Sequence, residues 1–229
     1  MNIKVIAFDA DDTLWDNETH FFNVENEMCQ ILAPYGDKKT ISDSLFKTEM
    51  ANMDDYGYGA MAFTLSLVEN AVKVSKGKVP ADDIAKIVEL GRTLLRLDAK
   101  PLNGVFETLR QLKNEGKHKL VVFTKGELLT QEHKLQRSGL QQFFDKTVIV
   151  SDKKEQQYTD LCNDLGIEPS ELLMVGNSLK SDILPALNIG SWAAHIPFEV
   201  MWQHEVIEHF EHNRMFHLDK FAELLNVLK

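Results

Sequence analysis

The stretch VIAFDADDTLW, residues 5–15, decides how the rest of the chain is interpreted. Its first four residues are apolar, and three carboxylates follow within the next four positions. A short apolar run rich in Val, Ile and Phe is typical of a strand that is buried in a parallel sheet. Open α/β sheets bind their ligands at the carboxyl ends of such strands. We therefore expect Asp9 and Asp11 to lie in a ligand site.

The composition favours a soluble protein with a small-molecule partner. With 229 residues, 44% of them hydrophobic and 26% charged, the chain can form one core domain and a smaller inserted one. A net charge of −10 argues against binding to nucleic acid or to an anionic membrane surface, and no stretch is apolar for long enough to cross a membrane. A small anionic substrate is still compatible, because a local metal ion or lysine can reverse the sign of the charge.

The cysteines and the N-terminus predict a cytoplasmic location. Cys29 and Cys162 are the two cysteines of the sequence, and their spacing fits neither a CxxC motif nor a disulfide framework. Free thiols of this kind are typical of a reducing compartment. The N-terminal residues resemble a strand rather than a secretory signal. The sequence is compatible with a monomer or a homodimer.

The distribution of helical and strand patterns predicts two domains. Residues 16–99 are helical in pattern, with a turn-rich loop at residues 54–59 that contains Tyr56 and Tyr58. From residue 100 onward, helices alternate with short apolar strands, which indicates βαβ units and a parallel sheet. We predict an α/β fold with a Rossmann-like parallel-sheet core formed by residues 1–15 and 100–229. Residues 16–99 would form an inserted α-helical cap domain that covers the site like a lid.

Polar side chains follow four of the predicted strands. Strands are expected at residues 5–8, 119–124, 146–150 and 172–176, and a further one at 190–196. The polar residues after the first four are Asp9 and Asp11, then Thr124, then Lys153 or Lys154, and finally Asn177 and Asp182. Because parallel strands end at one edge of the sheet, we expect these groups to converge. Their oxygen donors suit Mg²⁺, and the lysine and threonine suit a phosphate group.

These four segments resemble the four motifs of the haloacid dehalogenase-like superfamily of phosphohydrolases. FDADDTL at residues 8–14 is similar to the Asp-x-Asp-x-Thr motif, and VFTKG at residues 122–126 resembles the second motif. SDKK at residues 151–154 fits the lysine motif, and VGNSLKSD at residues 175–182 resembles the acidic fourth motif. The resemblance spans residues 3 to about 197. The helical insertion lies where the type 1 cap of the family is found.

The resemblance implies a Mg²⁺-dependent phosphatase that acts on a small phosphorylated metabolite through an aspartyl-phosphate intermediate. Asp9 would be the nucleophile, and Asp11 would be the general acid and base. Thr124 would donate a hydrogen bond to the phosphoryl group, and Lys153 would neutralise its charge. The residues implied as metal ligands are Asp9, the backbone carbonyl of Asp11, Asn177 and Asp182.

Three positions depart from the family pattern or leave a choice. Asn177 stands where the family usually has Asp, so either Asn177 or Asp182 could be the direct metal ligand. Lys153 and Lys154 are adjacent candidates for the site lysine, and the spacing to Tyr158 favours Lys153. Lys125 often corresponds to Asn in the family, and here it would add positive charge beside the substrate phosphate.

Alternatives remain at the level of function. A phosphomutase shares the same core residues, and a catalytically silent binding module could use the same scaffold. A haloacid dehalogenase lacks the second carboxylate, so Asp11 argues against that activity. Tyr56 and Tyr58 could contact substrate or could simply pack within the cap. The histidine-rich stretch at residues 204–217 only approximates a zinc-protease helix, so we interpret it as a solvated surface helix.

Overall fold

The computed structural model describes residues 1–228 and divides the chain into two compact units. The first consists of Met1–Glu18 and Ala99–Lys229, and the second is the continuous segment Thr19–Asp98. Each unit has a hydrophobic core of its own. The helical segment is therefore an insertion into the chain of the first unit.

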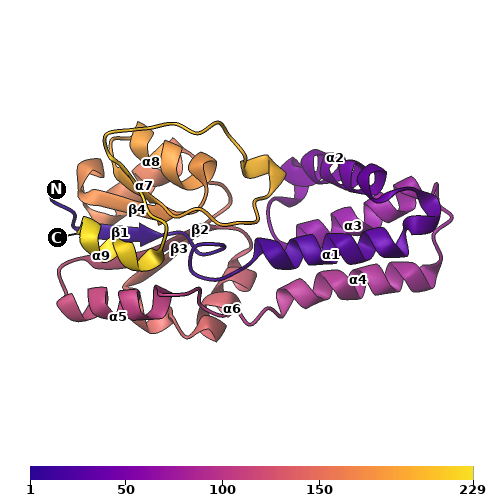
Figure 1. Ribbon diagram of the computed structural model, residues 1–229, viewed down its shortest axis with the longest axis horizontal. Helices are drawn as coiled ribbons and strands as arrows, with labels where there is room; N and C mark the ends of the chain where they lie inside the picture. The colour runs from indigo at the N-terminus through magenta and orange to yellow at the C-terminus, as the bar shows by residue number, and fades with distance from the viewer. Residues whose placement is uncertain (229) are drawn as a thin grey trace. The chain divides into compact units, whose positions relative to one another are not determined.

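The first unit contains a six-stranded sheet with the strand order β3-β2-β1-β4-β5-β6 (Figure 1). All neighbouring strands are parallel. The strands are β1 (Val5–Phe8), β2 (Lys119–Lys125), β3 (Lys146–Val150), β4 (Leu172–Gly176), β5 (Trp192–His195) and β6 (Met215–His217). From β1 the chain builds outward to β2 and β3 and then returns to place β4 on the other side of β1. The strand order thus reverses between β1 and β4, which is where open α/β sheets bind ligands.

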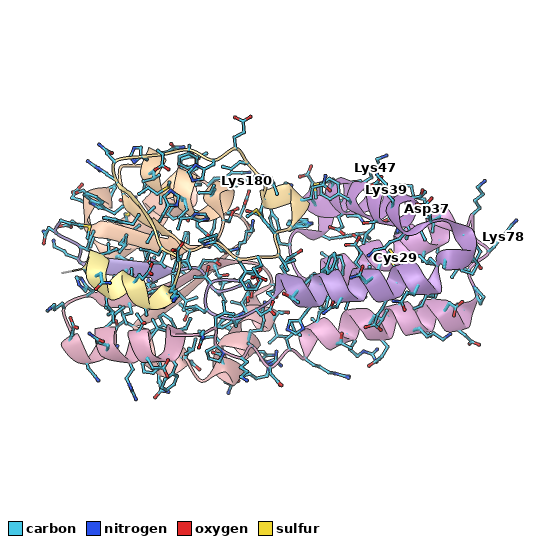
Figure 2. All side chains as sticks on the ribbon, viewed as in Figure 1. Cys29, Asp37, Lys39, Lys47, Lys78 and Lys180 are labelled. Atoms are coloured by element: carbon cyan, nitrogen blue, oxygen red, sulfur yellow. The ribbon has the colours of Figure 1, made fainter. Side chains whose placement is uncertain are left out.

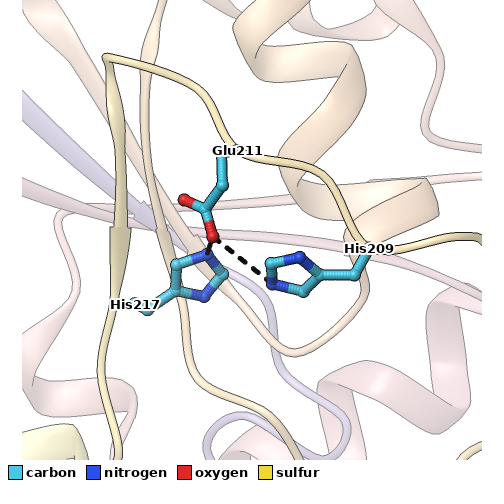
Figure 3. A group of neighbouring side chains, drawn as sticks. All are labelled: His209, Glu211 and His217. Carbon is cyan, nitrogen blue, oxygen red and sulfur yellow. Dashed lines mark ion pairs between the residues drawn. The ribbon is translucent and has the colours of Figure 1, made fainter.

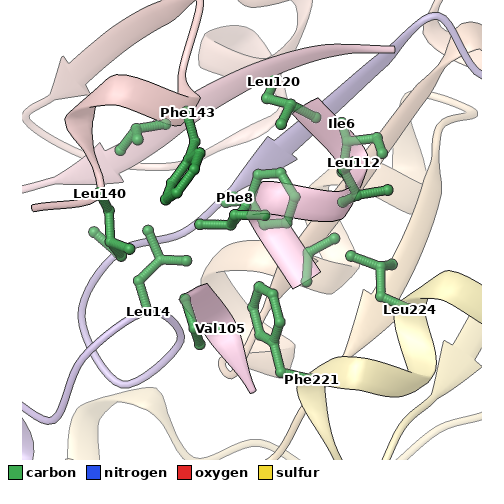
Figure 4. Close-up of a cluster of buried hydrophobic side chains, with 14 of the residues drawn as sticks. Ile6, Phe8, Leu14, Val105, Leu112, Leu120, Leu140, Phe143, Phe221 and Leu224 are labelled. Carbon is green, nitrogen blue, oxygen red and sulfur yellow. The ribbon is translucent and has the colours of Figure 1, made fainter. Parts of the chain in front are cut away.

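Both faces of the sheet are covered, which explains the unbroken apolar run of β1. Ile6 and Phe8 pack in a core to which three helices contribute: α5 (Val105–Glu115), α6 (Leu128–Ser138) and α9 (Leu224–Val227) (Figure 4). The alternate side chains, Val5 and Ala7, pack in a second core with α7 (Glu155–Leu165) and α8 (Leu184–Asn188). Burying one large apolar side chain contributes about 1.5–3 kcal/mol. The predicted α/β fold with a parallel sheet and a helical insertion is confirmed.

The second unit is built from four helices and a short 3₁₀ turn. The elements are α1 (Glu18–Ile31), η1 (Ala33–Tyr35), α2 (Lys38–Tyr56), α3 (Ala60–Val74) and α4 (Ala81–Leu95). Asp37 (labelled in Figure 2) caps α2 by accepting a hydrogen bond from the backbone N–H of Thr40 at 2.9 Å. A Cβ atom at Gly91 would lie 2.0 Å from Oγ1 of Thr64, so glycine permits the close packing of α4 against α3.

Two local predictions are wrong. Residues 54–56 belong to the last turn of α2, which ends at Gly57 with a φ of 69°, so Tyr56 is on a helix and not in a loop. The histidine-rich stretch is not a helix, because only Gln203–Glu205 form a short 3₁₀ turn and residues 206–214 run without regular structure to β6. Helix α8 is directly preceded by a π-helical turn, η4 (Leu179–Ile183). Within residues 1–228, none of the helices is long and apolar enough to cross a membrane.

Candidate active site

The carboxyl ends of the first four strands bring together the polar residues singled out in the sequence. Asp9 directly follows β1, and Thr124 lies near the end of β2. Lys153 lies three residues after β3, and Asn177 directly follows β4. The backbone N–H of Asp9 donates to the carbonyl of Val175 at 2.9 Å, which fixes Asp9 at the junction between β1 and β4.

Asp9, Lys153 and Asp182 form a buried ionic triad. The Nζ atom of Lys153 lies 2.5 Å from Oδ1 of Asp9 and 2.7 Å from Oδ1 of Asp182. All three residues are buried, whereas the neighbouring Lys154 is exposed and pairs with Asp152 at 2.7 Å. The geometry thus brings Lys153, and not Lys154, to the predicted nucleophile.

The charges of this triad are not balanced, since two carboxylates share one ammonium group. Burial, reinforced by the Asp182 carboxylate and opposed by Lys153, raises the pKa of Asp9 to about 7. Burial alone would lower the pKa of Lys153, but the carboxylates of Asp182 and Asp9 together raise it. The lysine therefore stays protonated, and the site retains an excess of negative charge that a further cation would balance.

The second oxygen of Asp182 holds the loop that follows β4. Oδ2 of Asp182 accepts a hydrogen bond from the backbone N–H of Ser178 at 2.9 Å. A Cβ atom at Gly176 would lie 2.3 Å from that same oxygen, so only glycine leaves room for the carboxylate. The buried hydroxyl of Tyr158 donates to the backbone carbonyls of Ser181 and Asp182, at 2.9 and 3.1 Å.

The residues present fit a magnesium ion by charge and by donor type. Oδ2 of Asp9 and Oδ1 of Asn177 both lie 3.2 Å from the hydroxyl oxygen of Thr13. Thr13 thus joins the loops after β1 and β4 and gathers a carboxylate and an amide oxygen in one place. Hard oxygen donors next to unbalanced buried negative charge are the surroundings in which Mg²⁺ binds. The oxygens of Asp182 bind Lys153 and the backbone of Ser178, whereas the amide oxygen of Asn177 shares the Thr13 hydroxyl with Asp9.

Asp11 faces a different set of partners from Asp9. Its Oδ1 accepts hydrogen bonds from Nε1 of Trp15 at 2.7 Å and from Nζ of Lys134 at 2.6 Å. Its Oδ2 accepts one from Nε2 of Gln131 at 2.9 Å. Three donors from two separate segments therefore fix the orientation of this carboxylate. Trp15 is buried, and its ring nitrogen points to the carboxylate.

Thr124 is connected to Asp11 through Gln131. The buried hydroxyl of Thr124 lies 3.4 Å from Nε2 of Gln131, which also donates to Asp11. The same amide group donates to the backbone carbonyl of Lys125 at 2.9 Å. Gln131 thus ties the end of β2 to the loop that carries the two carboxylates.

Lys125 is paired with an acid that the sequence did not single out. Its Nζ lies 2.5 Å from Oε1 of Glu205, and Oε2 of Glu205 accepts from the hydroxyls of Ser178 and Ser181 at 2.5 and 2.6 Å. Burial alone would raise the pKa of Glu205, but the charge of Lys125 and the hydrogen bonds from the two hydroxyls together lower it to about 2. Glu205 is therefore ionised and offsets the positive charge that was expected beside the phosphate.

Tyr56 and Tyr58 lie in the helical unit. Tyr56 is half exposed on α2, and Tyr58 is partly buried between α2 and α3. Their proposed contact with substrate remains a prediction.

Gln131, Lys134 and Glu205 are among the polar residues of this site that the sequence analysis missed. Gln131 and Lys134 are separated by one turn of α6, and both are only 4% exposed. They share the buried face of that helix with Leu135 and Ser138. A long polar side chain at a core-facing helical position was the available signal. For Glu205 the sequence held no such signal, since its partners are 24 to 80 residues distant.

Comparison with known proteins identifies a family of hydrolases to which this chain is similar. A model of the haloacid dehalogenase-like hydrolase family matches residues 3–190. The chain is 25% identical over 205 residues to N-acylneuraminate-9-phosphatase of Homo sapiens, covering 82% of this chain and 79% of that protein. It is 25% identical over 210 residues to glyceraldehyde 3-phosphate phosphatase of Methanothermobacter thermautotrophicus, covering 86% and 87%. The crystal structure of a haloacid dehalogenase-like family hydrolase from Xanthomonas campestris superposes with a TM-score of 0.90 at 30% identity, covering 99% of this chain and 91% of that one.

Proposed function

The chain belongs to the haloacid dehalogenase-like hydrolase family, and we propose that it is a Mg²⁺-dependent phosphatase for a small phosphorylated metabolite. The observation that carries this proposal is the separate environment of two carboxylates placed two residues apart. Asp9 is paired with Lys153 at the junction of β1 and β4, whereas Asp11 is held by Trp15 and Lys134. Two carboxylates in different surroundings can take different roles in one reaction.

Asp9 is the proposed nucleophile. One of its oxygens attacks phosphorus, and the bond from phosphorus to the leaving oxygen breaks, which leaves an aspartyl-phosphate. Lys153 lies 2.5 Å from this carboxylate and can neutralise the charge of the incoming phosphoryl oxygens. The hydroxyl of Thr124 can donate a hydrogen bond to one of the same oxygens. A water molecule then attacks phosphorus and releases Asp9 together with inorganic phosphate.

Asp11 is the proposed general acid and base. In the first step it gives its proton to the leaving oxygen, and in the second it takes one from the attacking water. The three hydrogen bonds from Trp15, Gln131 and Lys134 are those of the ionised carboxylate, which is the form that takes the proton of the attacking water, and they hold it in one orientation.

Asp9, the backbone carbonyl of Asp11 and Asn177 would hold the magnesium ion, with Asp182 in support through Lys153 and Ser178. When bound, Mg²⁺ would supply positive charge that balances the carboxylates and the phosphoryl group. We favour Asn177 over Asp182 as the direct ligand, because its amide oxygen and a carboxylate oxygen of Asp9 both lie 3.2 Å from the hydroxyl oxygen of Thr13, whereas Asp182 is held by Lys153 and the backbone of Ser178.

The similar proteins support a small phosphorylated substrate. Those named above are phosphatases for N-acylneuraminate 9-phosphate and glyceraldehyde 3-phosphate, at 25% identity. A dehalogenase is the less favoured activity, because that subgroup lacks a carboxylate at the position of Asp11. Cys29 and Cys162 are free and buried, which supports the cytoplasmic location predicted from the sequence.

An aryl phosphate with a good leaving group tests the proposal. We expect hydrolysis that requires Mg²⁺, stops with EDTA and is lost in Asp9→Asn. Lys154→Ala is the matched control for Lys153→Ala, because Lys154 is exposed and pairs with Asp152. The Lys154→Ala protein should retain activity. Equal activity of Asp9→Asn and the unmodified protein would contradict the covalent mechanism. A panel of phosphorylated metabolites, screened with the wild type and with Tyr58→Ala, would identify the substrate class and test the predicted contact of Tyr58.

A further inference from the structure

A second group of convergent side chains lies at the β5–β6 edge of the sheet, separate from the triad of Asp9, Lys153 and Asp182. It consists of His209 and Glu211 from the irregular segment 206–214 and His217 at the end of β6 (Figure 3). One ligand atom from each of the three lies within 4.8 Å of the other two. Nε2 of His217 and Nε2 of His209 lie 3.7 and 3.9 Å from the same oxygen, Oε1 of Glu211.

The hydrogen bonds behind this group determine which nitrogen of His217 carries the proton. His195 is the register partner of His217 in β5, and its Nε2 lies 3.0 Å from the backbone carbonyl oxygen of Asn177. A carbonyl can only accept, so Nε2 of His195 must carry a hydrogen. In the neutral imidazole of His195 this leaves Nδ1 as the acceptor.

The acceptor nitrogen of His195 determines where His217 carries its hydrogen. Nδ1 of His217 lies 3.4 Å from Nδ1 of His195, so His217 must be the donor in this contact. In the neutral imidazole of His217 the lone pair is then on Nε2, which faces Glu211. Nε2 of His217 and Oε1 of Glu211, 3.7 Å apart, are then two electron-pair donors that a cation between them can bind.

The presence of His209 favours a metal ion over a proton. A single proton on His217 would satisfy one contact with Glu211, whereas a metal ion uses all three donors at once. Metal bonds of about 2.0–2.2 Å in a tetrahedral arrangement place neighbouring donors roughly 3.3 Å apart, whereas Oε1 of Glu211 lies 3.7 and 3.9 Å from the two ring nitrogens. The side chains are exposed, so small rotations can close the remaining gap.

We propose that His209, Glu211 and His217 bind one borderline divalent transition-metal ion of the Zn²⁺ class. Two imidazoles and one carboxylate select such ions over Mg²⁺, which prefers oxygen donors. His195 is the supporting partner that orients His217 by accepting its Nδ1 hydrogen, as the hydrogen-bond partners of zinc-binding histidines commonly do. This site is independent of the proposed phosphatase activity.

Titration with Co²⁺ as a coloured substitute for Zn²⁺ tests the proposal on the full, untagged chain near neutral pH. Excess Mg²⁺ is present so that Co²⁺ does not occupy the oxygen donors around Asp9, and Asp9→Asn serves as a second background. We expect a visible absorption band that saturates at one equivalent and is displaced by Zn²⁺. His209→Ala and His217→Ala should each weaken binding at least about ten-fold.

His212→Ala is the matched control, since His212 lies in the same segment and its ring accepts a hydrogen bond from the backbone N–H of Arg214. It should bind as the unmodified protein does. Long-range nitrogen–proton NMR tests the protonation pattern without a substitution: His217 should carry its hydrogen on Nδ1 and His195 on Nε2, and Zn²⁺ should shift the Nε2 resonance of His217.

Two results would overturn the proposal. One is the absence of saturable Co²⁺ and Zn²⁺ binding, which would leave the three side chains as an exposed group without a ligand. The other is binding of unchanged affinity in both His209→Ala and His217→Ala, which would place the ion elsewhere. Neither result bears on hydrolysis by Asp9, so the proposed function is tested separately.

Discussion

The ammonium group of Lys134 lies 2.6 Å from the carboxylate of Asp11, although 123 residues separate them in the chain. Both the ammonium and the neighbouring amide of Gln131 come from the buried face of α6. A helix that begins shortly after β2 therefore fixes the orientation of a carboxylate that follows β1. This contact connects the motif of the first strand to the helix that follows the second strand.

Lys134→Met should lower kcat more for alkyl phosphates than for aryl phosphates. Asp11 would lose one of its three donors, and its proton transfer matters most when the leaving oxygen is strongly basic. We expect a loss of kcat of about ten- to a hundred-fold for an alkyl phosphate, with KM little changed. Arg137→Met, on the exposed face of the same helix, is the control. An equal loss for both classes of substrate would show that Lys134 acts only on stability.

Magnesium affinity should increase with pH. Burial and the Asp182 carboxylate raise the pKa of Asp9 to about 7, so a proton competes with the metal below that pH. Affinity should fall by up to about ten-fold for each pH unit below 7, and binding near neutrality should release protons. Calorimetry in buffers with different ionisation enthalpies measures both effects. In Asp9→Asn the affinity should be weaker and independent of pH; a slope equal to that of the wild type would assign the titration to another group.

Glu205→Gln should destabilise the protein near neutral pH and less so in acid. The pKa of Glu205 is about 2 when folded, against an ordinary value of 4.5, so its charge stabilises the folded state above pH 4.5. This stabilisation is lost as the pH falls from 4.5 through about 2. We expect a difference in the free energy of unfolding of roughly 1–3 kcal/mol at neutral pH, halved near pH 3. Urea unfolding of the wild type and the variant over this range measures it. Glu208→Gln changes an exposed neighbour and should leave the pH dependence of the free energy of unfolding unchanged. A Glu205→Gln protein whose loss of unfolding free energy is the same at every pH would contradict the account.

Gly176→Ala should disturb the site by displacing Asp182. The added Cβ would lie 2.3 Å from Oδ2 of Asp182, which then could not bind both Lys153 and the backbone of Ser178. We expect a loss of stability of about 1–3 kcal/mol and weaker magnesium binding. Gly36→Ala is the control, because its Cβ would meet its nearest neighbour at an ordinary 3.6 Å. A Gly176→Ala protein with unchanged melting temperature and metal affinity would refute this role.

The residues of the first motif could be located from the sequence because the strand and the carboxylates are adjacent in the chain. Residues 5–8 are apolar throughout, since both faces of β1 are buried, and the carboxylates follow at once. The pairing of Lys153 with Asp9 followed from the convergence of parallel strand ends, which depends on topology and not on distances along the chain.

The partners that come from helix faces and irregular segments could not be predicted in this way. From the sequence alone, Gln131 and Lys134 are indistinguishable from residues on a solvent-exposed helix face, because the sequence does not show which side of α6 is buried. The contacts of Glu205 with Lys125 and Ser178 depend on the path of residues 196–214. The sequence pattern does not reveal this path and instead predicts a surface helix for Glu205. Such contacts are fixed by tertiary packing, and no local pattern encodes them.

The central claim is that Asp9 becomes covalently phosphorylated, and chemical trapping in Asp11→Asn tests it most directly. With a radiolabelled aryl phosphate the leaving group needs no acid, so Asp9 should still be phosphorylated, while hydrolysis slows because no base activates water. We predict that acid quenching traps a label sensitive to hydroxylamine, that borohydride reduction converts residue 9 to homoserine, and that Asp9→Asn carries no label. Turnover of the wild type without a trapped label in Asp11→Asn, or a label on any other residue, would contradict the account.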